Sequence, residues 1–118
     1  MNTSILTVEG KSEEKSRQRA VLLGLLGRHA ARRQAQASLE ELHQLACSAG
    51  VLPIAVFFQE LETPDAALFV GKGKAYEVRD FIEEHQIALA IVDDELAPCQ
   101  QRNLETLWNC PVIDRTVL

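Results

Sequence analysis

Short continuous apolar runs alternate along the chain with longer stretches whose apolar residues have helical spacing. Residues 20–26 (Ala-Val-Leu-Leu-Gly-Leu-Leu) form an uninterrupted apolar run, the pattern of a strand buried on both faces. Residues 51–59 and 87–92 are similar runs, and residues 112–113 begin a fourth. Because Pro53 cannot donate a hydrogen bond to a neighbouring strand, the second strand is expected to begin irregularly or to lie at a sheet edge.

Amphipathic stretches separate these runs and predict three helices. Ser38 and Glu41 form a capping-box pattern that predicts the start of the first helix, and residues 28–37 before it are predicted to be a basic connection. The second helix follows residues 71–74, and the third begins at Pro98, whose missing N–H is tolerated in a first turn. The apolar positions expected to face the core are Leu39, Leu42, Ala46, Ala49, Ala75, Val78, Phe81, Ile82, Leu104, Leu107 and Trp108.

The resulting order is β-α-β-α-β-α-β with short connections. Such alternation predicts an α/β fold with a four-stranded, mainly parallel sheet flanked by helices, joined by right-handed crossovers. Residues 1–19, which carry few apolar positions, are predicted to be a flexible leader, and residues 20–118 to be a single α/β domain. The order of the strands within the sheet does not follow from the sequence.

Charge is distributed unevenly along the chain. The net charge of the 118 residues is -5, yet residues 1–37 are basic and residues 38–118 are strongly acidic. An acidic body is not typical of a DNA-binding domain, although the basic leading part could either contact RNA phosphates or remain a solvated arm. No apolar run approaches the ~20 residues of a membrane span, and no signal peptide is recognisable, so a cytoplasmic location is predicted.

The three cysteines and three histidines show no metal-ligand or disulfide pattern. Cys47 is predicted to be a small packed thiol rather than a nucleophile. Trp108 and the pair Phe57 and Phe58 are predicted to belong to the core rather than to a stacking platform. No Ser-His-Asp or Cys-His arrangement can be argued from spacing, so this chain itself is not expected to be an enzyme.

Four polar motifs are the candidates for chemistry. Gly71-Lys-Gly-Lys74 precedes a helix, where backbone amides favour anions, and could bind a phosphate or be a simple turn; it lacks the hydroxyl that a nucleotide-binding P-loop offers to magnesium. Asp93 and Asp94 follow a strand and are weak candidates for a magnesium site, or simply residues favoured at a helix start. No other metal ligands are predicted.

The other two motifs lie further along the chain. Gln100-Gln-Arg-Asn103, on the first turns of a helix, could bond RNA or another domain, or form an exposed face with Arg102 paired to a nearby acid. Asp114-Arg-Thr116, directly after a strand, is predicted to be an interdomain hinge or a solvated strand end. The predicted binding residues are Gly71, Lys72, Gly73, Lys74, Gln100, Gln101, Arg102 and Asn103, and the predicted hinge residues are Asp114, Arg115 and Thr116.

Three motifs together resemble the N-terminal domain of the HflX family of translational GTPases. The specific one is Asp93-Asp-Glu-Leu-Ala-Pro-Cys-Gln-Gln-Arg-Asn-Leu-Glu105. Phe69-Val-Gly-Lys-Gly-Lys74 is similar to the family's aromatic-Ile-Gly-x-Gly-Lys element, and Val112-Ile-Asp-Arg-Thr116 to its Val-Ile-Asp-Arg-Thr. The chain departs from the family at Ala97, where a capping Ser is usual, at Cys99, and in the acidic character of residues 59–65. The family's motif positions carry over as Gly71, Gly73, Lys74, Asp93, Asp94, Glu95, Pro98, Gln100, Gln101, Arg102, Asn103, Asp114, Arg115 and Thr116.

The resemblance implies a binding or regulatory domain of a GTP-binding protein that associates with the large ribosomal subunit and splits or rescues ribosomes. The implied partners are ribosomal RNA and the protein's own helical and G domains, and the implied cofactors of the full-length protein are GTP and Mg. The G domain, with its P-loop, is absent from this chain, so no cofactor is expected here. Two alternatives remain: a nucleotide and Mg module built on Gly71–Lys74, or a scaffold that only regulates the G domain.

Overall fold

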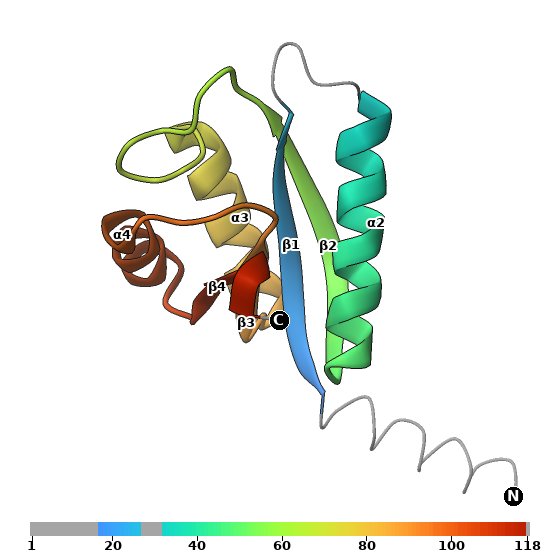
Figure 1. The fold of residues 1–118 in the computed structure, drawn as a ribbon. Helices are drawn as coiled ribbons and strands as arrows, with labels where there is room; N and C mark the ends of the chain where they lie inside the picture. Colours follow the sequence, from blue (N-terminus) through green and yellow to red (C-terminus); the bar gives the residue numbers. More distant parts are fainter. Residues whose placement is uncertain (1–16, 27–31, 118) are drawn as a thin grey trace, which may run out of the picture.

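A computed structural model describes residues 17–26 and 32–117 of the chain (Figure 1). The predicted β-α-β-α-β-α-β order is confirmed. The elements are β1 (Gln18–Leu26), α2 (Arg32–Ser48), β2 (Val51–Glu60), α3 (Lys72–His85), β3 (Leu89–Val92), α4 (Pro98–Trp108), β4 (Val112–Asp114) and the 3-10 helix η1 (Arg115–Val117).

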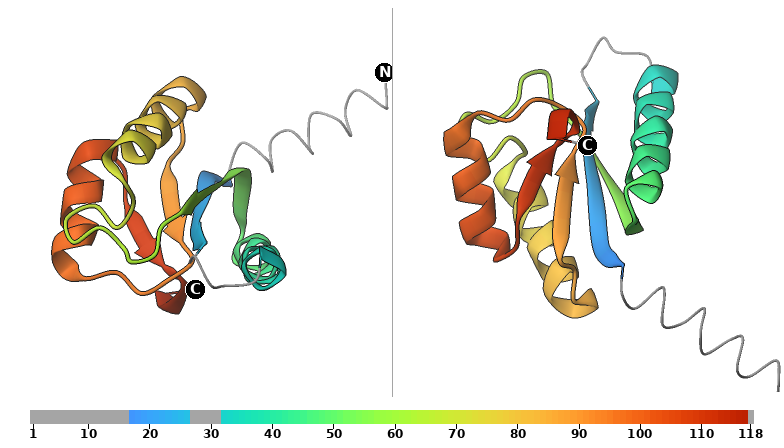
Figure 2. Two further views of the ribbon diagram at one scale, coloured as in Figure 1. Left: turned by 90° about the horizontal axis from the view of Figure 1, so that it is seen from above. Right: turned by 60° about the horizontal axis from the view of Figure 1, so that its bottom comes forward.

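The four strands form one sheet in the order β2-β1-β3-β4, and every neighbouring pair is parallel. Helix α2 covers one face of the sheet, over β1 and β2, while α3 and α4 cover the other face (Figures 1 and 2). The predicted α/β class with a four-stranded parallel sheet is therefore confirmed.

Strand β1 lies inside the sheet and contributes to the apolar clusters on both faces. Val21 and Leu23 belong to the cluster beneath α3 and α4, and Ala20 and Leu22 to the cluster beneath α2. All four are fully buried. This accounts for the continuous apolar run in the sequence, because neither face of the strand meets water.

Gly24 allows α2 to pack closely on β1. A Cβ atom at this position would lie 2.7 Å from Cδ1 of Leu39, which is itself buried on α2. A glycine within a strand often marks such a close approach. The bare backbone of Gly24 therefore provides the space in which Leu39 sits.

Trp108 closes the core on the opposite face. Its side chain is 1% exposed, and its indole Nε1 donates a hydrogen bond to the carbonyl of Ala75 at 2.8 Å, which joins α4 to α3. Phe57 and Phe58 are half-buried and pack against the two clusters, and Phe57 contacts Phe81 edge-on at 5.3 Å between ring centroids. The prediction that these aromatic residues belong to the core is confirmed.

Both expectations for the second strand are also confirmed. β2 is an edge strand, and its pairing with β1 shifts near Pro53. Pro53 lies opposite Ala20 whereas Ala55 lies opposite Val21, so Ile54 is an extra residue. The irregularity falls where a proline interrupts the hydrogen-bond ladder.

The predicted start of the first helix is wrong. Helix α2 begins at Arg32, inside the stretch predicted to be a connection, so Ser38 lies within the helix and does not cap it. Arg, Gln and Ala all have high helix propensity, which outweighs the capping-box pattern. Ala49, predicted to face the core, is exposed because α2 ends at Ser48. At the other boundary, β1 begins at Gln18; the remainder of the predicted leader, residues 1–16, lies outside the described residues.

The segment before α3 is a tight turn, residues 65–70. The N–H groups of Asp65 and Phe69 each bond the other's carbonyl, and the N–H of Val70 donates to the carbonyl of Leu68 at 2.6 Å. The buried Phe69 between them has φ 66°. A bulky side chain is strained in this left-handed region, and the strain is tolerated because the ring fills the core.

Candidate functional site

The carboxyl ends of all four strands lie at one edge of the sheet, because the strands run in the same direction. Helices α3 and α4 begin at this edge, which we call the carboxyl edge, and lie side by side on one face (Figure 1). The structure thus brings the two predicted polar motifs, residues 71–74 and 100–103, to the same edge.

The first motif opens α3 with Gly71 as its N-cap residue. The N–H of Gly71 donates to Oε1 of Gln59 at 2.7 Å, and a Cβ atom on Gly71 would come 2.9 Å from Nε2 of the same side chain. Glycine is thus needed here for a close approach, whereas a Cβ atom on Gly73 would meet nothing within 4 Å. Since one of its amides is already bonded, the loop offers fewer free N–H groups to an anion than the sequence suggested.

The cations around this helix start differ in their surroundings. Lys74 is paired with Glu77 at 3.1 Å. Lys72 is exposed, makes no ion pair with any described residue, and lies 6.0 Å from the ring centroid of Tyr76. Arg79 also lies over that ring, at 4.7 Å. Lys72 is therefore the cation of the motif that remains available to an outside partner.

The amides of the second motif are occupied inside the molecule. Gln100, only 8% exposed, donates through Nε2 to the carbonyl of Asp65 at 2.7 Å and accepts the N–H of Ala97 through Oε1 at 2.9 Å. Asn103 donates to the carbonyl of Ala67 at 2.9 Å. The glutamine thus supplies only the returning half of a capping box, since the Ala97 side chain cannot accept a first-turn N–H, and the side chains of Gln100 and Asn103 hold the β2–α3 loop against α4.

Gln101 and Arg102 complete this motif with opposite roles. Gln101 donates to the carbonyl of Val112 at 2.7 Å, and Glu105 accepts the N–H of the same residue at 3.0 Å, so α4 fixes the start of β4. Arg102 is exposed, and its expected pairing with a nearby acid is wrong: no acidic group in the described part of the chain lies within ion-pair distance. Arg102 is therefore the residue of this motif whose charge is available to an outside partner.

Arg115 joins three elements, a role that the sequence did not reveal. Its guanidinium donates to Oγ of Ser38 at 2.6 Å and to the carboxylates of Asp93 at 2.9 Å and Glu41 at 2.7 Å. The hydrogen bond to Glu41 and the charge of Asp93 raise its pKa. The end of β3, the start of η1 and the middle of α2 are thus tied together, and the i, i+3 spacing of Ser38 and Glu41 is the only sequence signal of this site.

The carboxylates of the acidic turn, Asp93 and Asp94, make hydrogen bonds within the chain. Asp93, whose side chain is 7% exposed, is bonded to Arg115, and Asp94 accepts the N–H of Glu95 at 2.8 Å. Among the described residues, no group of three or more His, Cys, Asp or Glu side chains could hold a metal ion. Asp93 and Asp94 therefore do not present the open pair of carboxylates that a magnesium ion would need.

The predicted hinge residues also bond within the chain. The carboxylate of Asp114 accepts the hydroxyl and the N–H of Thr116 with one oxygen and the N–H of Leu96 with the other. These donors, the Thr116 hydroxyl first, lower the pKa of Asp114 below its ordinary 3.8. Asp114 thus stabilises η1 and fastens the β3–α4 loop to the end of β4.

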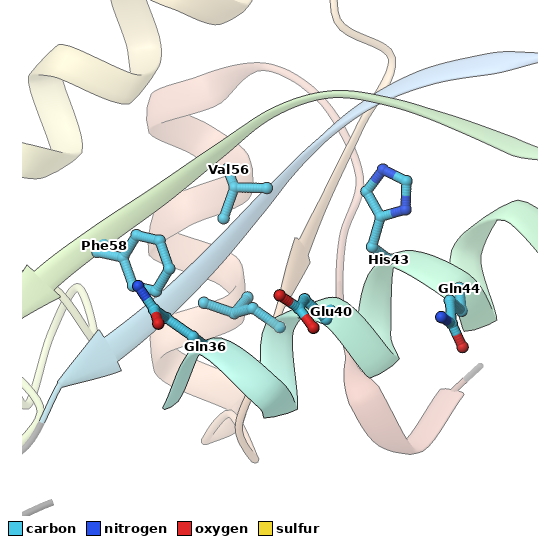
Figure 3. A pocket seen from close by; sticks show the side chains of 7 residues that line it. Gln36, Glu40, His43, Gln44, Val56 and Phe58 are labelled. Carbon is cyan, nitrogen blue, oxygen red and sulfur yellow. The ribbon is translucent and has the colours of Figure 1, made fainter. Parts of the chain in front are cut away.

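A groove of about 510 Å³ lies on the other face, between α2 and β2 (Figure 3). Its floor is apolar and its rim, on α2, is polar. The sequence did not predict it, because it results from the helix and the edge strand lying side by side. The lining residues are Gln36, Leu39, Glu40, His43, Gln44, Val56 and Phe58.

Cys47 lies one helical turn beyond this groove, and its predicted burial is wrong. The thiol is exposed on α2, and its sulfur is 3.7 Å from Nδ1 of His43. Its neighbour Ala46 faces the core, so Cys47 is turned to solvent. A contact at i, i+4 on an exposed helix face needs no functional explanation.

Comparison with known proteins shows the class to which this fold and its carboxyl-edge motifs belong. A family model described as GTP-binding GTPase N-terminal matches residues 36–118. The GTPase HflX of Escherichia coli (strain K12) is 40% identical over 80 residues, which are 68% of this chain and 19% of that protein. The GTPase HflX of Magnetococcus marinus is 39% identical over 100 residues, 85% of this chain and 23% of that protein. The chain belongs to the HflX family and corresponds to its N-terminal domain.

A third relative extends the match with lower identity. The GTPase HflX of Flavobacterium psychrophilum is 31% identical over 101 residues, 86% of this chain and 24% of that protein. The chain thus spans about a quarter or less of the length of these relatives. The activity of the whole proteins is not carried over to this chain by the match alone.

Proposed function

We propose that this domain binds and positions an HflX-type GTP-binding protein on the large ribosomal subunit, with its carboxyl edge against ribosomal RNA. Membership of a GTPase family supports the setting. The observation that carries the RNA contact is the pair of exposed cations, Lys72 and Arg102, on two adjacent helix starts. Helix N-termini and unpaired cations both favour phosphate groups.

The contact is local rather than a property of the whole surface. Residues 38–118 are strongly acidic, and the RNA must therefore meet a small cationic area within a surface that repels it. Gln100, Gln101 and Asn103 act in this proposal as supports, since their internal bonds hold the loops that carry the cations.

GTP and magnesium belong, in this proposal, to the G domain of the full-length protein. The chain has no P-loop, the N–H of Gly71 is already bonded, and Asp93 is paired with Arg115. We therefore expect this domain to hydrolyse no GTP by itself. The nucleotide-binding alternative for Gly71–Lys74 predicts slowed amide exchange at Gly73 and Lys74 on adding GTP and Mg.

A second candidate function is that of a scaffold for the protein's own helical and G domains. It is favoured by the tie at Arg115, which fixes η1, and by the exposed side chains of Leu45 and Val117, 40% and 67% accessible. Val117 lies with Arg115 in η1, so a domain that packs on η1 would cover it. In this candidate, residues 114–116 set the direction in which the next domain leaves.

The proposed location is the cytoplasm, where ribosomes are found. None of the helices in the described residues has the length and apolar character required to cross a bilayer. A domain that contacts ribosomal RNA and its own G domain needs no such span.

Co-sedimentation of the 118-residue chain with purified large ribosomal subunits over a salt series tests the proposal. We expect binding that weakens with salt, and the double variant Lys72→Glu, Arg102→Glu should bind less and show a salt slope smaller by about 1–2. Arg33→Glu, an exposed charge reversal on α2 within the basic leading part of the chain, should bind like the wild type if the carboxyl edge alone carries the contact.

The outcomes separate the two candidates. If the chain fails to co-sediment at low salt, or if the double variant binds like Arg33→Glu, the RNA contact at the carboxyl edge is refuted. Binding to separately produced helical and G domains, lost on Leu45→Lys or Val117→Lys, would instead support the scaffold.

A further inference from the structure

Strand β2 has a long, unprotected outer edge. Among the described residues, none pairs with β2 on the side away from β1. The strand is ten residues long and carries no charge before Glu60, whereas the opposite edge strand, β4, has three residues and ends at Asp114. Natural edge strands are usually short, charged or covered, because their free N–H and C=O groups pair readily with another strand.

The position of α2 shows which partner fits this edge. The helix packs on both β1 and β2, so its axis lies above the space between them. Neighbouring strands are about 4.8 Å apart, and two β2 edges paired about a two-fold axis would place their α2 helices about 10 Å apart. That is close to the usual separation of packed helices. We propose that a second copy of this chain pairs antiparallel with β2, giving an eight-stranded sheet.

The apolar groups at the edge are self-complementary. Val56, 41% exposed, lies near the middle of β2, where the two-fold axis would fall. Phe58, two residues on, points to the same face and lines the same groove (Figure 3). With the axis at Val56, antiparallel pairing places Val56 of one copy beside Val56 of the other, and Phe58 of each copy lies diagonal to it. The groove between α2 and β2 then becomes the interior of the dimer.

The polar rim of the groove is compatible with the same arrangement. Glu40 and His43 line it together with two glutamines, and no Lys or Arg is present. In an antiparallel pair of α2 helices, the half with Glu40 faces the half with His43, so a carboxylate acceptor meets an imidazole that can donate a hydrogen bond across the axis. A two-fold interface uses one surface twice, and this surface contains both members of the pair.

Sedimentation velocity and light scattering of the 118-residue chain over a wide concentration range test this proposal. The wild type should show a monomer–dimer equilibrium, and Val56→Lys should weaken dimerisation by more than about tenfold. His43→Glu, an exposed change that brings like charges together across the axis, should weaken it without disturbing the monomer. Val117→Lys, at an apolar site outside this face, is the matched control and should dimerise like the wild type. Circular dichroism verifies that each variant is folded.

Several results would overturn the proposal. These are a wild-type chain that stays monomeric at the highest concentration, a dimer that both Val56→Lys and His43→Glu leave intact, or a dimer that Val117→Lys weakens equally. Open-ended polymers would also overturn it, because a head-to-tail contact, not a two-fold one, produces them. Capture of an unrelated extended peptide on β2 in place of a second copy would assign the edge to another partner.

Discussion

Replacing Arg115 by methionine should destabilise the domain more than its partly exposed position suggests. The side chain is 30% exposed, but the carboxylate of Asp93 to which it is bonded is only 7% exposed. Methionine keeps most of the aliphatic stem, so packing is largely preserved. The main change is that a nearly buried carboxylate loses its only cationic partner among the described residues.

The expected loss in the free energy of unfolding follows from how exposed Arg115 and Asp93, the two partners of the ion pair, are. Breaking a fully buried ion pair costs about 3–5 kcal/mol, and since water reaches the guanidinium, we expect about 2–3 kcal/mol for Arg115→Met. The contact with Glu41, 65% exposed, contributes less than about 1 kcal/mol of this. Asp93→Asn in the Arg115→Met background removes the uncompensated charge and should recover about 1–2 kcal/mol.

Urea unfolding at neutral pH, followed by circular dichroism, measures these differences from the transition midpoint at an unchanged slope. The matched control is Arg79→Met, because Arg79 pairs with Asp80, which is 68% exposed, and its loss should cost under about 0.5 kcal/mol. The reasoning fails if Arg115→Met costs no more than this control, or if adding Asp93→Asn destabilises the variant further.

Three further predictions concern single side chains. Trp108→Phe should lower the free energy of unfolding by about 1–3 kcal/mol in urea titrations, since a buried ring shrinks and a carbonyl loses its donor; a cost near zero would contradict the packing described. The hydrogen bond to Thr116 lowers the pKa of Asp114 and stabilises the fold above pH 3.8, so the stability deficit of Thr116→Val should shrink as pH falls below that value in acid titrations. Burial, and then the nearby Glu105, raise the pKa of Cys110 to about 11, so mass spectrometry should show slower alkylation by iodoacetamide at pH 8 than at Cys47; equal rates would contradict the burial.

The fold could be predicted from the sequence where the information is local and repeated. The buried runs of β1 and β3, Pro98 at the start of α4 and Pro53 at an edge each follow from the chemistry of a few neighbouring residues. The start of α2 could not be predicted in this way. Ser38 satisfies a capping pattern, but residues 32–37 before it also favour a helix. The helix propensity of residues 32–37 decided between two locally acceptable starts.

The site was less predictable, because its contacts join distant parts of the chain. The motif containing Gln100 was recognised, but the bond from its amide to the carbonyl of Asp65 spans 35 residues and carries no local signal. The same holds for Arg115, whose partners Ser38 and Asp93 lie 77 and 22 residues away. The residue types indicated which motifs carry polar side chains. Only the fold showed which of these side chains bond within the domain and which remain available to a partner.

The central position of β1 has a consequence for the way this domain forms during synthesis. Strand β1 comes before both of its neighbours in the chain, and these follow 33 residues later at Val51 and 69 residues later at Leu89, counting from Gln18 and Ala20. At about 5–20 residues per second, the apolar run of β1 therefore waits for several seconds before its second neighbour emerges. During this interval the apolar run of β1 is not yet covered by both neighbours, so a polar substitution there would lessen misassociation of the nascent chain while weakening the finished sheet.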